Sequence, residues 1–242
     1  MVMIMLKYLI RLKEYIAFMR PIAIDWLMRQ NTSSPRLYYN PICKAWFCIT
    51  NKDEFRAVSL LDEPETTRYI AAQSGDCFLD IGAYLGKYSL LASNKFRLIH
   101  AFEPNRQSYS RLRIHVVLNK CRNIKCHPVA LGSQKAIATF FLKGRRSSFI
   151  YKSRRTTTVP VKPLDMYKLW LTNMAIDLVK IDVEGYEYFV LKGMRKTIKF
   201  FHPTIIVEIH AYNPYRKNTL KLLKTYGYKL ERRLDQENYL FS

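Results

Sequence analysis

A glycine-containing turn after a short apolar strand is the first place in this chain where residue types and spacing could support chemistry. The predicted strand Cys77–Ile81 runs into Asp80-Ile-Gly-Ala-Tyr-Leu-Gly86, and a helical pattern follows. Gly82 and Gly86 allow the backbone to approach a ligand closely and to adopt positive φ. Glu103 lies 21 residues after Gly82, at the end of the next predicted strand. Because a carboxylate there can accept both hydroxyls of a ribose, the pattern predicts a nucleoside site at the carboxyl edge of a parallel sheet.

The spacing of this turn differs from that of a dinucleotide-binding loop. Such loops have the pattern Gly-x-Gly-x-x-Gly and hold a pyrophosphate at a helix N-terminus. This chain has Asp-x-Gly-x-x-x-Gly instead, with a carboxylate two residues before the first glycine. An anionic side chain suits a positively charged ligand better than a phosphate. We therefore predict S-adenosylmethionine, which carries a sulfonium and an ammonium but no phosphate, as the cofactor.

A second group of polar residues follows two later predicted strands. Asp182 comes directly after Ile176–Ile181, and Glu208 and His210 end the strand Thr204–His210 with their side chains on one face. Ligands of open α/β sheets bind beyond the carboxyl ends of the strands, so these three residues are the candidate catalytic residues. Asp182 or His210 can take a proton from an acceptor hydroxyl, and a structural role at a strand end is the alternative for each. All three are metal-ligand types, but their spacing is not diagnostic, and we predict no metal site.

Strands that alternate with helices must position these residues. This alternation predicts an α/β fold with a mostly parallel sheet. An antiparallel excursion over residues 136–163 and a closing C-terminal hairpin interrupt it. The predicted strands are 77–81, 97–102, 124–130, 176–181 and 204–210, the helices are 86–93, 105–119 and 186–199, and the hairpin strands are 227–232 and 239–241.

The first 60 residues are predicted to be an accessory segment, and residues 61–242 the main domain. Apolar residues between 6 and 19 fall on one helical face, with charged residues between them, and a short hairpin over 37–50 follows. The helix either packs on its own domain, which we favour, or lies in a membrane interface. The apolar run at the N-terminus is too short to span a membrane and lacks the flanks of a signal peptide. We therefore expect a cytoplasmic protein, with peripheral membrane contact through residues 1–20 as the alternative.

The net charge indicates which partners the protein favours, and the cysteine content indicates the compartment in which it works. The chain has 40 Lys and Arg against 19 Asp and Glu, a net charge of +21, which favours anionic partners. Its 49% of hydrophobic residues exclude a mainly disordered chain. Five cysteines are an odd number in a chain long enough to bury a core, so we expect free thiols, a reducing compartment and no zinc site.

Four segments, in order, resemble the FkbM-type methyltransferases: Phe78–Ser89, His100–Asn105, Val129–Gly132 and Asp177–Glu187. The resemblance covers about residues 38–241 and extends to Ile205–His210. It implies a class I methyltransferase fold that uses S-adenosylmethionine, usually to methylate a hydroxyl oxygen. Tyr84 departs from the family, which generally has Asn at this position. The cofactor contacts that the resemblance implies are Asp80, Gly82, Ala83, Tyr84, Gly86, Glu103, Pro104, Ala130 and Leu131.

Two functions compete at this point. The favoured function is O-methylation of a saccharide or another small molecule. The alternative is methylation of an RNA base or ribose, which the charge of +21 and the basic segment Arg145–Arg155 suggest. Enzymes that methylate base amines resemble one another in an Asn/Asp-Pro-Pro-aromatic motif, whereas this chain has Asp182-Val-Glu-Gly there. That difference argues against base methylation and leaves ribose methylation open; a non-enzymatic binding module is a third alternative.

Overall fold

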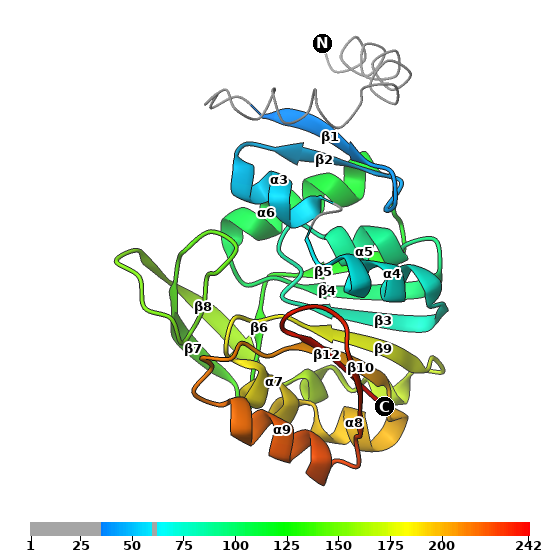
Figure 1. Ribbon diagram of the computed structural model, residues 1–242, viewed down its shortest axis with the longest axis vertical. Helices are drawn as coiled ribbons and strands as arrows, with labels where there is room; N and C mark the ends of the chain where they lie inside the picture. The colour runs from blue at the N-terminus through cyan, green and yellow to red at the C-terminus, as the bar shows by residue number, and fades with distance from the viewer. Residues whose placement is uncertain (1–34, 60–61) are drawn as a thin grey trace.

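The computed structural model describes residues 35–59 and 62–242, and its centre is a seven-stranded sheet (Figure 1). The strand order is β11–β12–β10–β9–β3–β4–β5, and every strand except β12 runs in the same direction. This order confirms the predicted class I methyltransferase fold with its C-terminal antiparallel hairpin. The strands are β3 (Gly75–Ile81), β4 (Phe96–Phe102), β5 (Ile124–His127), β9 (Ile176–Ile181), β10 (Thr204–Glu208), β11 (Leu230–Arg233) and β12 (Asn238–Phe241).

Helices cover both faces of this sheet (Figure 1). Successive side chains of a strand point to opposite faces, so Phe78 and Leu79 of β3 enter two different cores. A strand covered on both faces has a nearly continuous apolar sequence, which is why β3 and β9 could be predicted from the sequence. One face carries α4 (Pro64–Ala72), α5 (Lys87–Ala92) and α6 (Arg106–Leu118), and the other carries α7 (Glu187–Gly193), α8 (Arg195–Phe201) and α9 (Arg216–Thr225).

The predicted N-terminal hairpin forms from β1 (Arg36–Asn40) and β2 (Ala45–Ile49) and packs on α6. The backbone N–H of Trp46 donates to Asn119 Oδ1 (2.7 Å), and the backbone N–H of Cys48 donates to His115 Nε2 (3.0 Å). Phe47 is fully buried in the same core as the sheet, so the hairpin is part of that core. The domain division at residue 60 stays a prediction.

The predicted N-terminal helix lies outside the described residues. Within the described part of the chain, no helix is both long and apolar enough to cross a membrane.

A smaller sheet forms beside the main one from β6 (Ala130–Leu131), β8 (Thr156–Lys162) and β7 (Ala136–Phe141), in that order. Strands β7 and β8 are antiparallel, as the sequence predicted for this excursion. The chain between them reaches the exit of β9, where Ser148 Oγ donates to the backbone carbonyl of Glu184 (2.6 Å). The excursion therefore covers the carboxyl edge of the main sheet.

Two predicted elements are divided in the structure. The predicted strand 124–130 ends at His127, because Pro128 has no N–H for a sheet hydrogen bond, and the chain then joins the smaller sheet. The predicted helix 186–199 is divided into α7 and α8. The Asp165 carboxylate accepts two backbone N–H groups in the first turn of α8 and so caps a new helix start.

The sequence analysis missed α4, α9 and a short helix, α3 (Lys52–Val58). Asn51 Oδ1 accepts the backbone N–H of Glu54 (2.9 Å), and Glu54 Oε2 accepts the backbone N–H of Thr50 (2.6 Å). This arrangement resembles a capping box, and its Asn-x-x-Glu signal was present in the sequence. Ala57 and Val58 at the end of this helix line the pocket described next, as do Asp62, Glu63 and Pro64.

Candidate active site

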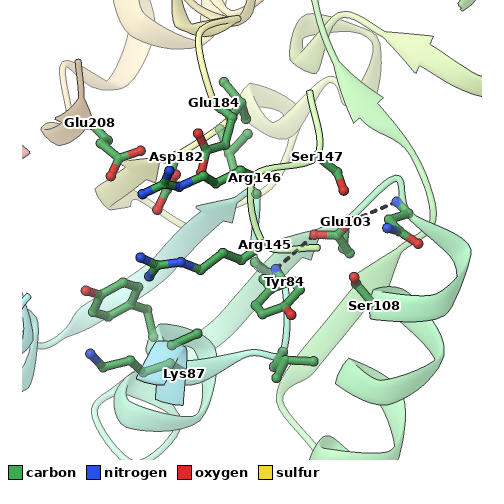
Figure 2. A pocket seen from close by; sticks show the side chains of 18 of the residues that line it. Tyr84, Lys87, Glu103, Ser108, Arg145, Arg146, Ser147, Asp182, Glu184 and Glu208 are labelled. Carbon is green, nitrogen blue, oxygen red and sulfur yellow. Dashed lines mark hydrogen bonds between the residues drawn. The ribbon is translucent and has the colours of Figure 1, made fainter. Parts of the chain in front are cut away.

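A pocket of about 490 Å³ opens at the carboxyl ends of β3, β4, β9 and β10 (Figure 2). Its volume is typical of small-molecule sites. Ten of the twelve predicted site residues line it, whereas Asp80 and Gly86 do not. The ten are Gly82, Ala83, Tyr84, Glu103, Pro104, Ala130, Leu131, Asp182, Glu208 and His210.

The turn after β3 brings the backbone of two strands into contact. Gly82 has φ +89°, and a Cβ at this position would lie 1.7 Å from the carbonyl oxygen of Asp182. No larger residue fits without moving the exit of β9. The Asp80 carboxylate lies below the turn, 2% exposed, and accepts the hydroxyl of Ser89 in α5. Burial raises the pKa of Asp80 to about 6, and its hydrogen bond shows that it supports the turn from within the fold.

Glu103 projects from the end of β4 and holds the turn from the other side (Figure 2). Its Oε2 accepts the backbone N–H of Tyr84 (2.9 Å), and its Oε1 accepts the backbone N–H of Asn105 (2.7 Å). Burial raises the pKa of Glu103 to about 7, although these two bonds oppose the shift. Each carboxylate oxygen retains a free acceptor site, so the group fits the two hydroxyls of a ribose. The bond from Tyr84 uses its backbone and does not require the Asn that the family generally has there.

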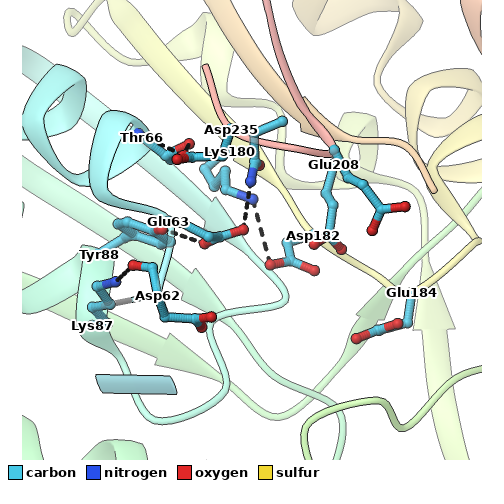
Figure 3. Close-up of polar contacts among 12 residues, drawn as sticks. Asp62, Glu63, Thr66, Lys87, Tyr88, Lys180, Asp182, Glu184, Glu208 and Asp235 are labelled. Atoms are coloured by element: carbon cyan, nitrogen blue, oxygen red, sulfur yellow. Dashed lines mark hydrogen bonds and ion pairs between the residues drawn. The ribbon is translucent and has the colours of Figure 1, made fainter. Parts of the chain in front are cut away.

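The opposite side of the pocket is crowded with carboxylates (Figure 3). Lys180 is fully buried, and its Nζ lies 3.4 Å from Asp182 Oδ2. Burial alone would lower the pKa of Lys180, but Asp182, Glu63 and Glu208 raise it above its usual value, so the ammonium stays charged. Burial would likewise raise the pKa of Asp182, but Lys180 lowers it overall. Asp182 is therefore an ionised carboxylate at neutral pH.

His210 lies between three carboxylates. Its Nε2 is 3.0 Å from Glu184 Oε2 and 3.4 Å from Glu208 Oε2, and its Nδ1 bonds Glu237. Burial lowers the pKa of His210, but Glu184 and Glu237 raise it to about 9. The imidazole therefore already holds a proton at neutral pH and is not available as a base in this arrangement. Burial and the neighbouring Asp182 raise the pKa of Glu208 well above its usual value.

Two parts of the pocket can now be defined by their residues. The cofactor half consists of Gly82, Ala83, Tyr84, Glu103 and Pro104, and the acidic half consists of Glu63, Asp182, Glu184, Glu208 and Glu237. Glu63 and Glu237 were missed from the sequence, because neither lies in a recognisable motif. Glu63 Oε1 accepts a hydrogen bond from the side-chain amide of Asn238 in β12, and its Oε2 accepts one from the hydroxyl of Tyr88 in α5. These bonds connect the start of α4 to both elements.

Two arginines from the β7–β8 connection lie over the pocket (Figure 2). Arg145 pairs with Asp62 at 2.9 Å. Arg146 lines the pocket and is exposed. The mouth is therefore basic while the interior of the acidic half is negative. A nucleoside with a positively charged tail fits this arrangement, with its ribose at Glu103 and its charge toward the acidic half.

Comparisons with known proteins agree with this geometry. The model described as Methyltransferase FkbM domain matches residues 80–230. The hexuronic acid methyltransferase AglP of Haloferax volcanii is 26% identical over 194 residues, which cover 77% of this chain and 80% of the relative.

Two solved structures are similar at lower identity. An FkbM methyltransferase from Methylobacillus flagellatus KT is 21% identical over 69% of this chain and 43% of its own, with a TM-score of 0.47. TYW2 of M. jannaschii, in complex with AdoMet, is 15% identical over 88% of this chain and 85% of its own, with a TM-score of 0.46. Similarities this low add nothing to the family match. Because that match spans more than half of the 242 residues, the chain belongs to the FkbM methyltransferase family and uses S-adenosylmethionine as its methyl donor.

Proposed function

We propose that the protein transfers the methyl group of S-adenosylmethionine to a hydroxyl oxygen of a saccharide. The observation that carries this proposal is the contact of the two halves in one pocket, where Gly82 abuts the backbone of Asp182. Ionised carboxylates accept hydrogen bonds from hydroxyl groups, and a saccharide presents several. The similarity to a relative named as a hexuronic acid methyltransferase supports the same substrate class.

The cofactor half takes the nucleoside in this proposal. Glu103 binds the ribose hydroxyls, and the backbone of Gly82, Ala83 and Tyr84 approaches the methionine end. Pro104 and the Ala130–Leu131 segment flank the adenine, which agrees with their place on the pocket wall. Asp80 and Gly86, which do not line the pocket, act by shaping the turn.

The acidic half receives the acceptor and its proton. Methyl transfer forms a C–O bond and breaks the C–S bond, and the acceptor hydroxyl loses one proton. Asp182 is the residue we propose to accept it, because Lys180 keeps this carboxylate ionised and its side chain is 29% exposed. Placement of the hydroxyl in line with the sulfonium supplies much of the rate, since the methyl group is already activated. His210 contacts Glu184 and Glu208 through its Nε2 and so orients both side chains.

RNA ribose methylation is the second candidate, and the charge of +21 is the observation that favours it. Arg154 and Arg155 are exposed and free to meet phosphates. The acidic half opposes this reading, because its carboxylates repel phosphates at the position where the acceptor must lie. A neutral stretch of saccharide, or one whose own charge stays outside the pocket at Arg146, meets no such repulsion.

Incubation with methyl-labelled S-adenosylmethionine tests the proposal. The acceptors are oligosaccharides that contain hexuronic acid, neutral oligosaccharides and total RNA, and the Glu103→Ala variant is the control. We expect label in a saccharide fraction, and loss of that label in the variant. Label in RNA alone, with the same dependence on Glu103, would overturn the saccharide proposal and leave the methyltransferase assignment intact.

We also propose that the protein works in the cytoplasm. All five cysteines, each within the described residues, are free thiols, and a reducing compartment keeps thiols in this state. Contact with a membrane through residues 1–20 remains the alternative for its N-terminal segment.

A further inference from the structure

We propose that Glu184, Glu208 and His210 form a binding site for one divalent cation in the acidic half of the pocket. The sequence analysis predicted no metal site, because these residues show no diagnostic spacing. The fold brings them together from the exit of β9 and the end of β10, with one donor atom of each within 4.8 Å of the others.

The distances around His210 match the edges of a coordination sphere. Its Nε2 lies 3.0 Å from Glu184 Oε2 and 3.4 Å from Glu208 Oε2. A six-coordinate cation with ligand bonds of about 2.1 Å places neighbouring ligands about 3.0 Å apart. The three donor atoms therefore need only small movements, and the loss of the proton on His210 Nε2, to share one ion.

The orientation of the imidazole is a second and independent observation. A histidine that binds a metal usually donates its other ring N–H to a carboxylate, which fixes its tautomer and its direction. His210 is 7% exposed, and its Nδ1 bonds Glu237, so its Nε2 faces Glu184 and Glu208. This is the carboxylate–histidine–metal arrangement, with Glu237 outside the coordination sphere.

Two buried oxygen atoms that make no hydrogen bond with any described residue lie at the same end of the pocket. In the part of the chain that the structure describes, Glu208 Oε2 is buried and makes no hydrogen bond, and it contacts His210 Nε2 at 3.4 Å. Asn238 Oδ1 is also buried without a hydrogen bond in that part of the chain; the Nδ2 of the same side chain donates to Glu63, and Asn238 lies across from Glu208 in the β10–β12 register. Unpartnered acceptors in such a position are costly unless a donor or a cation meets them.

A second triplet, Glu63, Asp182 and Glu208, also has its donor atoms close together. Lys180 Nζ lies 3.4 Å from Asp182, so an ammonium already neutralises this group. In the Glu184 triplet the group that faces the carboxylates is the imidazole of His210, which can become a metal ligand once its Nε2 releases its proton. The ligand types also limit which ion can bind: two carboxylates and one imidazole without a thiolate suit Mn²⁺, whereas Mg²⁺ prefers oxygen ligands alone.

The coordination positions that the protein leaves open face the pocket. An ion there would bind oxygen atoms of the substrate that receives the methyl group, and it would favour loss of the proton from the reacting hydroxyl. This role rests on the proposed saccharide acceptor, whereas the cation site itself does not. The test is therefore made without methyl transfer.

Mn²⁺ is the probe, because its electron paramagnetic resonance signal reports the free ion directly. Metal-free full-length protein is titrated with Mn²⁺, and Glu184→Gln and Glu208→Gln are compared with Glu65→Gln, which removes the same charge at an exposed position on α4. We expect one Mn²⁺ per chain. Binding should weaken at least tenfold in each of the first two variants and stay within twofold in the control.

Glu237→Gln separates a metal site from a simple ion pair. Loss of an outer partner of a metal-bound histidine lowers metal affinity by about 10–100-fold, so this variant should bind Mn²⁺ more weakly and regain binding at high Mn²⁺. Near-ultraviolet circular dichroism confirms that each variant is folded. Absence of stoichiometric Mn²⁺ binding to the wild-type protein, or equal binding in all variants, would mean that His210 forms only an ion pair with its neighbours.

Discussion

The two halves of the pocket are built in different ways. The cofactor half is mostly backbone, from one turn, and its single key side chain, Glu103, is held by two backbone N–H groups. The acidic half is all side chains, from four segments between Glu63 and Glu237. Local spacing therefore specifies the first half, whereas only the folded sheet assembles the second.

This difference has an energetic counterpart. The cofactor half carries one buried carboxylate that existing N–H donors satisfy. The acidic half gathers five carboxylates around two cations, Lys180 and His210, and leaves one oxygen of Glu208 without a hydrogen bond among the described residues. Concentrated negative charge of this kind costs folding free energy and is typical of functional sites.

The largest expected effect is in the acidic half. Asp182→Asn should lower kcat at least a hundredfold, because the asparagine amide cannot take the proton from the hydroxyl group that receives the methyl. Affinity for S-adenosylhomocysteine should stay within threefold, since the cofactor half is unchanged. The measurements are turnover with an identified acceptor and calorimetry with S-adenosylhomocysteine. Full turnover in the variant would move the proton acceptor to another residue of the acidic half.

Asp182→Asn should also lower stability, which its place at a strand end alone would not suggest. Lys180 is fully buried, and loss of its closest counterion leaves a charge poorly compensated, at about 3 kcal/mol. The double variant Lys180→Met, Asp182→Asn should regain most of this free energy of unfolding and none of the activity. Thermal and denaturant unfolding of both proteins check this, and a double variant no more stable than the single one would contradict it.

The next effect is in the cofactor half. Glu103→Ala removes a charged hydrogen-bond acceptor. The binding of S-adenosylhomocysteine should weaken by about 1.5–3 kcal/mol, or roughly tenfold to a hundredfold in affinity. Calorimetry measures it, with Asp182→Asn as the matched control in the other half. Unchanged affinity in the Glu103→Ala protein would remove this residue from the ribose site.

The sequence predicted the parallel sheet, the family and the cofactor half for one reason. Strand β3, its turn and the end of β4 lie within about 30 residues, and buried strands keep a continuous apolar pattern. It predicted Asp182, Glu208 and His210 as neighbours because they lie at or just beyond the ends of adjacent parallel strands, although the predicted strand 204–210 ends at Glu208 in the structure.

Features set by contacts across the fold were not predicted. Glu63 reaches the pocket because its side chain, at the start of α4, accepts a hydrogen bond from Asn238 of β12, and Glu237 because the C-terminal hairpin returns to β10. The break between α7 and α8 depends on Asp165, 30 residues before the start of α8. No pattern near these residues carries that information.

The pH dependence of cofactor binding should reflect a group in the cofactor half alone. Burial raises the pKa of Glu103 to about 7, so the free protein holds this carboxyl neutral below that pH. A neutral carboxyl has one acceptor fewer, so affinity for S-adenosylhomocysteine should fall about tenfold from pH 8 to pH 6. The Glu103→Gln variant should bind weakly with a flat profile. If affinity for S-adenosylhomocysteine changed with pH equally in the variant and the wild-type protein, the titrating group would lie outside the cofactor half.

The smallest effect is expected outside the pocket, on the basic exterior. Arg154 and Arg155 are exposed, whereas Arg145 is tied to Asp62, so only the first two can be reversed without disturbing the site. The Arg154→Glu, Arg155→Glu variant should bind RNA more weakly, with a shallower dependence on salt, because fewer counterions are released. Its turnover on a saccharide should stay within twofold, since exposed charges are screened over the distance to the acidic half. Filter binding at several salt concentrations and turnover on the same preparation give both values. A large loss of turnover, together with structure-selective RNA binding by the wild-type protein, would make the basic exterior part of the substrate site and favour RNA as the acceptor.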